Sequence, residues 1–385
     1  MKNSIIIIIL SVVLLASCKE NRMEVIITNP SDVVHEKATI EIAWSDVTTK
    51  LPSADPSKIV VLNKATGDEL AHQIVYHGEK TPQFVIFQVT LKPEESANIL
   101  IKSGVAKQQP ESKTFGRIVP ERKDDFAWEN DRVAFRMYGP ALANENPSNG
   151  VDLWLKKTEK LIVNQFYEDD LNNEKSYHID HGEGLDCYKV GHALGCGGIA
   201  PFVNDTLWVG NHYITQEVLD NGPLRTTFRL TYDNLPVGRK IYSEEIIISI
   251  DAGSQLNKAI VSFDGDFTDI KVAAGIFLHK DTGNIKMDVA DGYIAFGEIA
   301  TSDAGVPAGR NYVATVIPDG KMLEYLKQQE HLLAIAPYTK GEKFTYYFGG
   351  GWNKWGFETD NDWFVYVKTF AESLKKPLTL IVTII

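Results

Sequence analysis

The sequence predicts an all-β protein in which a small N-terminal β-sandwich precedes a large, supersandwich-like domain of two packed antiparallel sheets. Short segments rich in β-branched residues recur along the whole chain, and turn residues such as Gly, Pro, Asn and Asp separate them. Some segments alternate apolar and polar residues and others are continuously apolar, as expected when two antiparallel sheets pack face to face. Only residues 322–330 and 363–375 have a helical pattern.

The N-terminus has the pattern of a lipoprotein signal peptide over residues 1–17. Lys2 precedes a short apolar run that ends in the small residues of Leu15-Ala16-Ser17-Cys18, which is typical of a secretory signal. These four residues resemble the bacterial lipoprotein box, and the resemblance implies cleavage before Cys18 and lipidation of that cysteine. An ordinary secretory signal is the alternative. We therefore expect a lipid anchor in a bacterial membrane, with the outer membrane favoured and the folded body facing the periplasm or the cell surface.

Residues 22–112 are predicted to form the small sandwich, a scaffold without candidate site residues. The length of this region suits a compact sandwich module. A polar stretch at 106–112 is typical of a linker, so residues 113–385 are predicted to form the larger domain. The predicted strands of the small module are residues 23–29, 38–44, 58–63, 84–91 and 98–104.

The chain carries a net charge of −12 at pH 7 and has no conspicuous basic run. This charge argues against a nucleic acid as the partner. It leaves an anionic substrate open, because the local charge at a site can oppose the net charge of the protein.

The larger domain begins with residues 115–142, a segment rich in arginine and aromatic residues. A strand that buries Phe135 and its apolar neighbours places Arg136 and Tyr138 together on the other face. Arginine binds carboxylates through two parallel hydrogen bonds, and an aromatic ring such as that of Trp128 offers a surface to sugar C–H groups. We therefore predict that Arg136, Tyr138 and Trp128 bind substrate. The alternative is a surface strand with ordinary salt bridges.

Residues 177–198, YHIDHGEGLDCYKVGHALGCGG, interleave histidines and acids with glycines in what the sequence indicates are loops around short strands. Clustered titratable groups are enriched at functional sites, and a solvated glycine-rich loop is the alternative. Cys187 and Cys196 form either a disulfide or two thiols, since the sequence does not give their separation. The candidate side chains of this stretch are His178, Asp180, His181, Glu183, Asp186, Tyr188, Lys189 and His192.

More strands are predicted from residue 225 to the end of the chain. A second patch of glycines and aromatic residues at 349–355 contains Trp352, which we predict as a further substrate-binding residue, with a core tryptophan as the alternative. The predicted strands are residues 225–233, 240–251, 258–265, 270–280, 292–300, 310–318, 344–352 and 378–385.

Four long motifs resemble a known family. They are RIVPERKDDFAWENDRVAFRMYGPAL, GVDLW, HIDHGEGLDCYKVGHALGCGG and GGGWNKWGF, and the resemblance covers nearly the whole mature chain. The motifs resemble secreted bacterial proteins filed as a domain of unknown function and found with polysaccharide-degrading enzymes. One branch is similar to an oligosaccharide dehydratase of ulvan breakdown. This resemblance implies a β-sandwich fold and the removal of water from a saturated uronic acid at the non-reducing end, which leaves a 4,5-unsaturated uronyl end. It carries over no catalytic residues.

Elimination of water removes the proton from C5, next to the carboxylate, and expels the C4 hydroxyl. The carboxylate has to be neutralised, and a base and an acid have to reach C5 and O4. A polysaccharide lyase uses the same elimination with a sugar as the leaving group, so the two reactions share one set of residues. We predict His178 or His181 as the base, Tyr188 as the acid, Arg136 or Lys189 as the carboxylate partner, and His192 as a further substrate-binding residue.

Two other classes of function remain open in the sequence. A non-catalytic glycan-binding lipoprotein would use Trp128, Trp352 and Trp355. A metal-dependent hydrolase would use the histidines at 178–192 with Asp180 as ligands. We predict no cofactor, and leave a divalent metal open.

Overall fold

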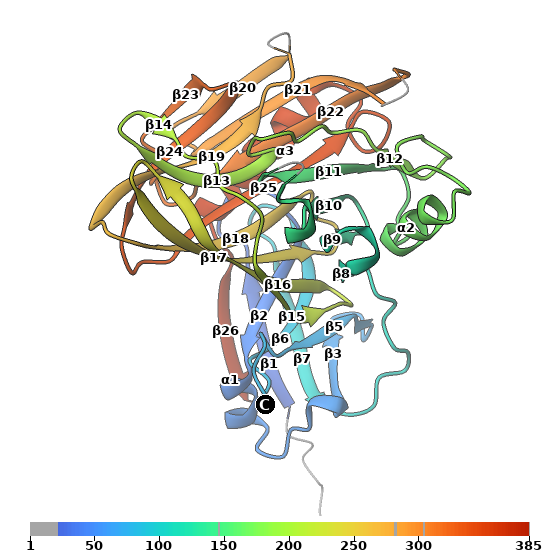
Figure 1. The fold of residues 1–385 in the computed structure, drawn as a ribbon. Helices are drawn as coiled ribbons and strands as arrows, with labels where there is room; N and C mark the ends of the chain where they lie inside the picture. The colour runs from blue at the N-terminus through green and yellow to red at the C-terminus, as the bar shows by residue number, and fades with distance from the viewer. Residues whose placement is uncertain (1–21, 145–146, 281–282, 303–304, 385) are drawn as a thin grey trace, which may run out of the picture.

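The computed structural model describes residues 22–144, 147–280, 283–302 and 305–384, and confirms the predicted all-β fold class (Figure 1). The strands of these residues form antiparallel sheets in two bodies, a small sandwich and a large domain of packed sheets. The predicted signal peptide and Cys18 lie outside the described residues. No helix in the described part of the chain is both long and apolar enough to span a membrane.

The small sandwich has a five-stranded sheet in the order β26-β1-β7-β3-β4 and a three-stranded sheet in the order β2-β6-β5. Alternate residues of β1, such as Val25, and Phe87 of β6 belong to the hydrophobic core of the small sandwich. Its elements are β1 (Arg22–Thr28), β2 (His35–Ala43), α1 (Trp44–Lys50), η1 (Pro56–Lys58), β3 (Ile59–Asn63), β4 (Glu69–Leu70), β5 (His72–Val75), β6 (Phe84–Leu91) and β7 (Ser96–Ser103).

The last strand, β26 (Thr379–Ile384), belongs to the small sandwich rather than to the larger domain in which the sequence prediction placed it. It pairs with β1 over the whole of its length, from Thr28 opposite Thr379 to Met23 opposite Ile384, and Figure 1 shows it beside the blue strands. The two ends of the described chain therefore meet in one sheet. The first strand of the larger domain's sheets starts at Thr114, and the last strand of the chain lies outside those sheets.

The core of the larger domain lies between an eight-stranded sheet, in the order β15-β16-β17-β18-β25-β22-β21-β20, and two five-stranded sheets. One of these has the order β14-β13-β19-β24-β23. The strands are β13 (Cys196–Val203), β14 (Thr206–Leu207), β15 (Thr215–Asn221), β16 (Arg225–Val237), β17 (Lys240–Asp251), β18 (Leu256–Asp264), β19 (Asp269–Phe277), β20 (Asn284–Asp288), β21 (Tyr293–Thr301), β22 (Pro307–Val316), β23 (Glu324–Gln328), β24 (His331–Thr339) and β25 (Phe344–Trp352).

The second five-stranded sheet, in the order β12-β11-β10-β9-β8, carries both motif segments singled out in the sequence. It packs one face on the eight-stranded sheet, and α2 with the segment after it covers the other. Its elements are β8 (Thr114–Val119), η2 (Pro120–Arg122), β9 (Asp125–Asn130), β10 (Ala134–Met137), η3 (Pro140–Leu142), β11 (Val151–Lys156), α2 (Val163–Leu171) and β12 (Gly184–Asp186).

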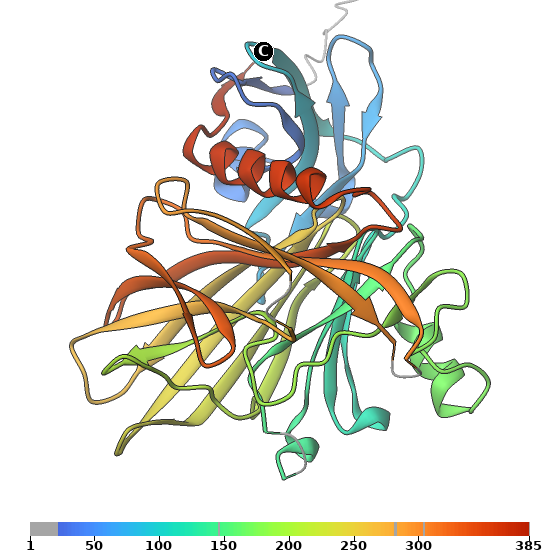
Figure 2. The same ribbon diagram turned by 90° about the horizontal axis from the view of Figure 1, so that it is seen from above.

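Of the two predicted helices, one is confirmed and one is wrong. Residues 363–375 lie in α3 (Asp360–Lys375), whose apolar stripe, including Trp363, packs on one face of the eight-stranded sheet (Figure 2). Residues 322–330 instead contain β23, which forms a hairpin with β24. Gln329 and Glu330 both adopt positive φ, 50° and 59°, as a tight two-residue hairpin turn requires. The sequence did not predict α1 and α2.

Candidate functional site

The candidate site lies on the face of β10 and β11 that points away from the main core. The two strands pair in antiparallel register, with Phe135 opposite Leu153 and Arg136 opposite Asp152. Because side chains alternate along a strand, Phe135 and Leu153 enter the core, and Arg136 and Asp152 point to the side covered by α2. The predicted separation of Arg136 from its apolar neighbours is therefore confirmed.

Arg136 is the centre of a buried ion cluster, with only 3% of the residue exposed. Its Nη2 atom lies 2.6 Å from Asp152 Oδ2 and 2.7 Å from Asp186 Oδ2, and its Nη1 lies 3.7 Å from Asp125 Oδ2. We call these four residues the Arg136 cluster. The predicted role of Arg136 as the partner of the substrate carboxylate is thus corrected: two carboxylates of the protein already occupy its guanidinium, which is out of reach of solvent.

Burial changes the acid–base behaviour of the cluster. Removal of Asp125 from water raises the pKa of its carboxyl to about 6, although the Arg136 and Arg122 guanidinium groups oppose the rise. The hydroxyl of Tyr167 lies 3.3 Å from Asp125 Oδ2 and donates a hydrogen bond to it. Burial also raises the pKa of Asp152. The charge of the cluster therefore changes near pH 6.

Three partly exposed side chains border the Arg136 cluster, and we call His178, Tyr138 and Arg122 the rim residues. The His178 side chain is 33% exposed, and its Nδ1 atom lies 3.1 Å from the carbonyl oxygen of Asp186 and 3.6 Å from the carboxylate of Asp186. The Arg136 guanidinium carbon lies 5.0 Å from the ring centroid of Tyr138, and burial raises the pKa of the Tyr138 hydroxyl. Arg122 hydrogen-bonds Tyr177, whose hydroxyl also accepts a hydrogen bond from Arg136.

The remaining polar residues of the loop before β12 face solvent and pair locally. His181 is exposed, and its Nε2 lies 3.2 Å from the carbonyl of Ser176. Asp180 pairs with Lys157 at 2.7 Å, and Glu183 pairs with Lys160 at 2.9 Å. No group of three or more His, Cys, Asp or Glu side chains in the described part of the chain is arranged to hold a metal ion.

The segment after β12 places its candidates elsewhere. Tyr188 is only 4% exposed and packs in the main core, and its hydroxyl has no hydrogen-bond partner among the described residues. Its predicted role as the acid is corrected, because substrate cannot reach the hydroxyl in this conformation. Lys189 and His192 are exposed on the loop that leads to β13.

Both tryptophans predicted to bind substrate are core residues. Trp128 is fully buried and donates a hydrogen bond from Nε1 to Asn257 Oδ1 at 2.8 Å. Trp352 is also fully buried, and its Nε1 donates to the carbonyl of Ala308 at 2.7 Å. Neither ring presents a face to a sugar, so this prediction is wrong and the alternative, core packing, is correct.

Sequence reasoning missed several residues that the structure brings together. Asp125 and Asp152 were missed, although an acid that interrupts the apolar GVDLW motif is itself a signal of a buried ion pair. His279 was also missed: its Nδ1 lies 2.6 Å from Glu298 Oε1 and its Nε2 lies 2.6 Å from the carbonyl of Lys189. Burial opposes protonation of His279, but the Glu298 carboxylate and the Lys189 carbonyl together raise its pKa. His279 thus ties the 187–195 loop to the eight-stranded sheet. Cys187 and Cys196 are not joined by a disulfide.

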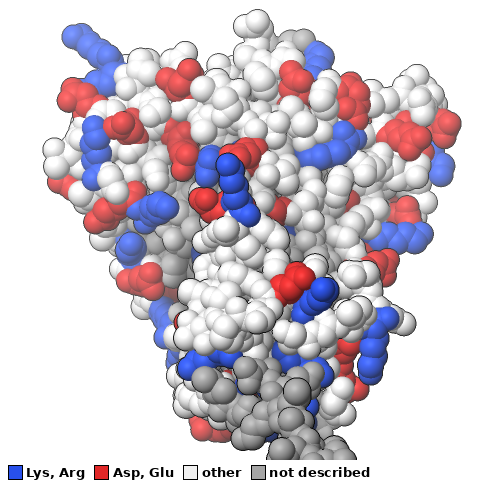
Figure 3. Space-filling view, turned by 90° about the horizontal axis from the view of Figure 1, so that it is seen from below, with Lys and Arg blue, Asp and Glu red and all other residues white. Residues whose placement is uncertain are grey.

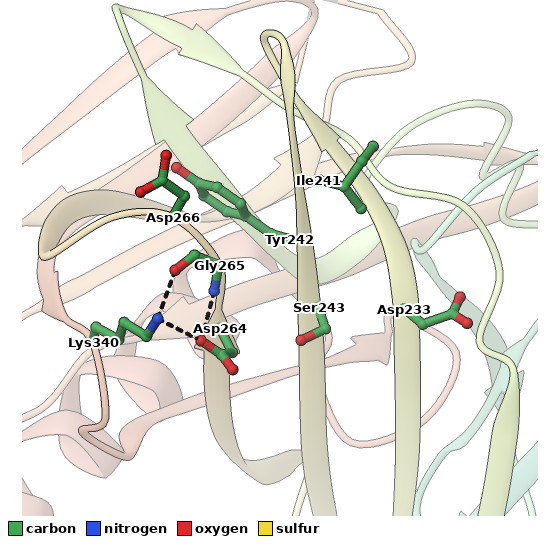
Figure 4. Close-up of a pocket in the computed structure, with 8 residues that line it drawn as sticks. All are labelled: Asp233, Ile241, Tyr242, Ser243, Asp264, Gly265, Asp266 and Lys340. Carbon is green, nitrogen blue, oxygen red and sulfur yellow. Dashed lines mark hydrogen bonds and ion pairs between the residues drawn. The ribbon is translucent and has the colours of Figure 1, made fainter.

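The described residues form shallow, open hollows at the surface, two of which are considered in turn. The larger, with a volume of about 550 Å³, is bordered by Asp233, Ser243, Asp264 and Lys340 (Figure 4). Lys340 Nζ lies 2.8 Å from Asp264 Oδ1 and donates to the carbonyl of Gly265 at 2.6 Å. This hollow contains none of the predicted site residues. On the face seen from below, acidic and basic side chains are interspersed (Figure 3).

Comparisons with known proteins identify the family and the fold. A relative from Formosa agariphila, described as "Uncharacterized protein P7", is 32% identical over 387 residues and covers 95% of each chain. A solved structure, a protein in the glycosyl hydrolase family 38 from Enterococcus faecalis, matches 94% of this chain with a TM-score of 0.52 and 10% identity. An alpha-mannosidase from Enterococcus faecalis V583 matches 94% of this chain with a TM-score of 0.49 and 9% identity.

The chain spans about half of each of these two structures, 47% and 46%, and the first likeness extends to the fold alone. The model of the family described as "Domain of unknown function (DUF4861)" matches residues 27–380. Because this match covers nearly all of the described residues, the chain belongs to the DUF4861 family.

Proposed function

We propose that the protein is a carbohydrate-active lyase that eliminates water from a uronic acid at the non-reducing end of an oligosaccharide and leaves a 4,5-unsaturated uronyl end. The resemblance of the sequence motifs to the ulvan oligosaccharide dehydratase supports the proposal. The observation that carries it is the arrangement of the rim: two partly exposed side chains able to transfer protons border the buried Arg136–Asp186 ion pair, His178 beside Asp186 and Tyr138 beside Arg136.

His178 is the base in this proposal. Its Nδ1 faces the carbonyl oxygen of Asp186 at 3.1 Å, so that nitrogen carries the proton and donates it. The neutral ring then holds its lone pair on Nε2. A carboxylate or carbonyl behind a histidine fixes the tautomer and the ring orientation in this way. His178 is preferred to His181 because it lies 3.6 Å from the Asp186 carboxylate of the Arg136 cluster, whereas His181 is exposed and hydrogen-bonds the carbonyl of Ser176.

Tyr138 and Arg122 supply the acid and the carboxylate partner. Burial raises the pKa of the Tyr138 hydroxyl, so it is protonated at neutral pH and gives up its proton only to a strongly basic group such as the departing O4 oxygen. Arg122 replaces Arg136 as the partner of the substrate carboxylate, because it is the guanidinium of this region that lies at the partly exposed rim. It neutralises the charge that spreads onto the carboxylate when C5 loses its proton.

In the proposed elimination, the C5–H bond breaks and its proton goes to His178 Nε2, while the electron pair forms the C4–C5 double bond. The C4–O4 bond breaks as Tyr138 gives its proton to O4, and water leaves. Solvent then carries the proton from His178 back to the Tyr138 phenolate. A polysaccharide lyase would use the same groups with a sugar in place of the C4 hydroxyl.

The alternative of a non-catalytic glycan-binding protein has less support from the structure than from the sequence. Its two main aromatic residues, Trp128 and Trp352, are buried in the core. Trp355 remains partly exposed and stacks under Arg132, 5.3 Å from its guanidinium carbon. Of the three tryptophans considered for a glycan-binding protein, Trp355 is therefore the one whose ring is partly exposed.

The test uses a saturated oligosaccharide that ends in glucuronic or iduronic acid. Dehydration is expected to appear as conjugated-alkene absorbance and as the mass loss of one water without chain cleavage. His178→Ala should lower the rate by about 10²–10⁴-fold without changing the circular dichroism spectrum, whereas Arg122→Ala should both raise KM and lower kcat, because Arg122 binds the carboxylate and neutralises the charge that develops on it.

Three outcomes would contradict the proposal or part of it. Shortened fragments with an unsaturated end would identify a polysaccharide lyase. Unchanged substrate that nevertheless binds would identify a glycan-binding protein. A fully active His178→Ala variant beside an inactive His181→Ala variant would move the base to His181.

We also propose that the protein is lipid-anchored through Cys18 to a bacterial membrane, with the outer membrane favoured and the body facing the periplasm or the cell surface. The lipoprotein box supports this placement. The partner proposed for this anchored enzyme is an acidic oligosaccharide. The net charge of −12 argues against a nucleic acid and leaves an anionic substrate open.

A further inference from the structure

A second hollow lies between η2 and α2, beside the rim. It has a volume of about 480 Å³, which is within the range of small-molecule sites. Polar side chains form nearly all of its lining. The lining residues are Arg117, Glu121, Asn164, Glu168, Leu171 and Asn172.

The same two elements build this hollow and the candidate site. Within η2, Glu121 lines the hollow and the next residue, Arg122, belongs to the rim. Within α2, Asn164 and Glu168 line the hollow, and Tyr167, between them in the sequence, donates its hydroxyl to Asp125 of the Arg136 cluster. A chain of sugars that places its end at the rim therefore has the hollow as a neighbouring surface.

The lining is fixed and carries excess negative charge. All three nitrogens of the Arg117 guanidinium are engaged: Nε with Asn164 Oδ1 at 2.7 Å, Nη2 with Glu121 Oε1 at 2.7 Å and Nη1 with the carbonyl of Ile118 at 3.0 Å. One arginine against two glutamates, Glu121 and Glu168, leaves the lining with a formal charge of −1. An anionic group such as a sulfate ester would meet repulsion there, whereas sugar hydroxyls find carboxylate and amide oxygens as hydrogen-bond acceptors.

We propose that the hollow between η2 and α2 is a subsite for an uncharged, unsulfated sugar residue, the one linked to the reacting uronic acid. The proposal rests on the proposed dehydration at the rim and adds to it the chemical class of the neighbouring sugar. A saturated glucuronic acid linked to a neutral hexose or deoxyhexose is the kind of substrate that the lining fits.

The test compares three compounds with the full-length protein: methyl glucuronide, glucuronic acid linked to an unsulfated neutral sugar, and the same disaccharide sulfated on the neutral sugar. We expect kcat/KM for the unsulfated disaccharide to exceed that for methyl glucuronide by about tenfold, since two or so additional hydrogen bonds form. The sulfated disaccharide should lose most of this advantage. Calorimetric binding of the same three compounds to His178→Ala gives a readout that does not need turnover.

Two variants and a matched control test whether the preference for the unsulfated disaccharide arises in the hollow. Asn164→Ala should remove the advantage of the unsulfated disaccharide and leave methyl glucuronide unaffected. Glu168→Gln should raise kcat/KM for the sulfated disaccharide by about two- to fivefold, because one like charge is removed at an exposed position. Gln165→Ala is the control: Gln165 is exposed on the same helix, hydrogen-bonds Asp169 and does not line the hollow.

The outcomes distinguish a failure of the subsite proposal from a failure of the dehydration proposal. If none of the compounds loses water but the unsulfated disaccharide binds more tightly than methyl glucuronide in an Asn164-dependent manner, the subsite stands and the dehydration proposal falls. Equal kcat/KM and equal affinity for methyl glucuronide and the unsulfated disaccharide would overturn the subsite. So would an equal effect of Asn164→Ala on both compounds, or a preference for the sulfated disaccharide.

Discussion

Glu244 should make the stability of this protein fall steeply as the pH rises through neutrality. The residue lies on β17 and faces the main core, where it is only 5% exposed. It stands opposite Tyr232 of β16 and Phe263 of β18, and its Oε2 atom is buried without a hydrogen-bond partner among the described residues. Burial is the cause that raises the pKa of its carboxyl from 4.5 to about 8.

The size and sign of the effect follow from that shift. The folded protein holds the proton of Glu244 up to about pH 8 and the unfolded chain only to about 4.5, so the folded state binds more protons between these values. The contribution of Glu244 to the free energy of unfolding is therefore complete below about pH 4.5. It is lost as the pH rises toward 8, at about 1.4 kcal/mol per pH unit. Between pH 5.5 and 7.5 this one group should lower the free energy of unfolding by about 2–3 kcal/mol.

Glu244→Gln tests this reasoning, since an amide of nearly the same shape does not titrate. We would measure urea unfolding by tryptophan fluorescence at several pH values from 5.5 to 8.5. The difference in unfolding free energy between the variant and the wild type should shift by about 2–3 kcal/mol in favour of the variant over that range. Other titrating groups are common to both proteins and cancel.

Glu245→Gln is the matched control. Glu245 is the next residue of β17, faces solvent with about half of its side chain exposed and lies 3.6 Å from Arg229. Its substitution should leave the pH dependence of unfolding unchanged. Parallel wild-type and Glu244→Gln curves across the whole pH range would refute the reasoning, because they would mean that the carboxyl is hydrated or paired in the folded protein.

Three more predictions concern the site and the anchor. Arg136→Met should lower the free energy of unfolding in urea by roughly 3–5 kcal/mol, because it leaves Asp152 and Asp186 buried without their cation; a loss below about 1 kcal/mol would contradict the cluster. KM for the anionic substrate should rise as the pH rises through about 6, where Asp125 becomes charged. Asp125→Asn should flatten this rise in a series of initial rates at different pH values. If the variant keeps the wild-type profile, the rise in KM comes from another group. Cys18→Ala should move the protein from the membrane to the soluble fraction on fractionation and immunoblotting, and continued membrane association would exclude the lipid as the sole anchor.

Local sequence signals located the elements whose stabilising contacts are themselves local. Helix α3 has its own capping box, in which Thr359 and Asp362 satisfy each other's backbone N–H groups. The sequence predicted residues 363–375 of this helix from their helical pattern. Helix α2 has no local side-chain cap. The N–H groups of Ile162 and Val163 instead donate to the carboxylate of Glu129 on β9, at 2.9 and 2.7 Å. Because this capping carboxylate lies more than thirty residues away in the sequence, no local capping pattern marks the start of α2. The sequence analysis therefore did not predict this helix.

Strand alternation determined which residues share a face, and the tertiary structure decided what covers that face. The sequence by itself gave the all-β class, the start of the larger domain and the separation of Arg136 from the apolar residues beside it. It did not show that α2 and the following loop seal Arg136 in with three aspartates, that Trp128 and Trp352 pack inside, or that β26 returns to pair with β1. The physical reason is that periodicity is a property of one strand, whereas burial and pairing depend on segments that lie far apart along the chain.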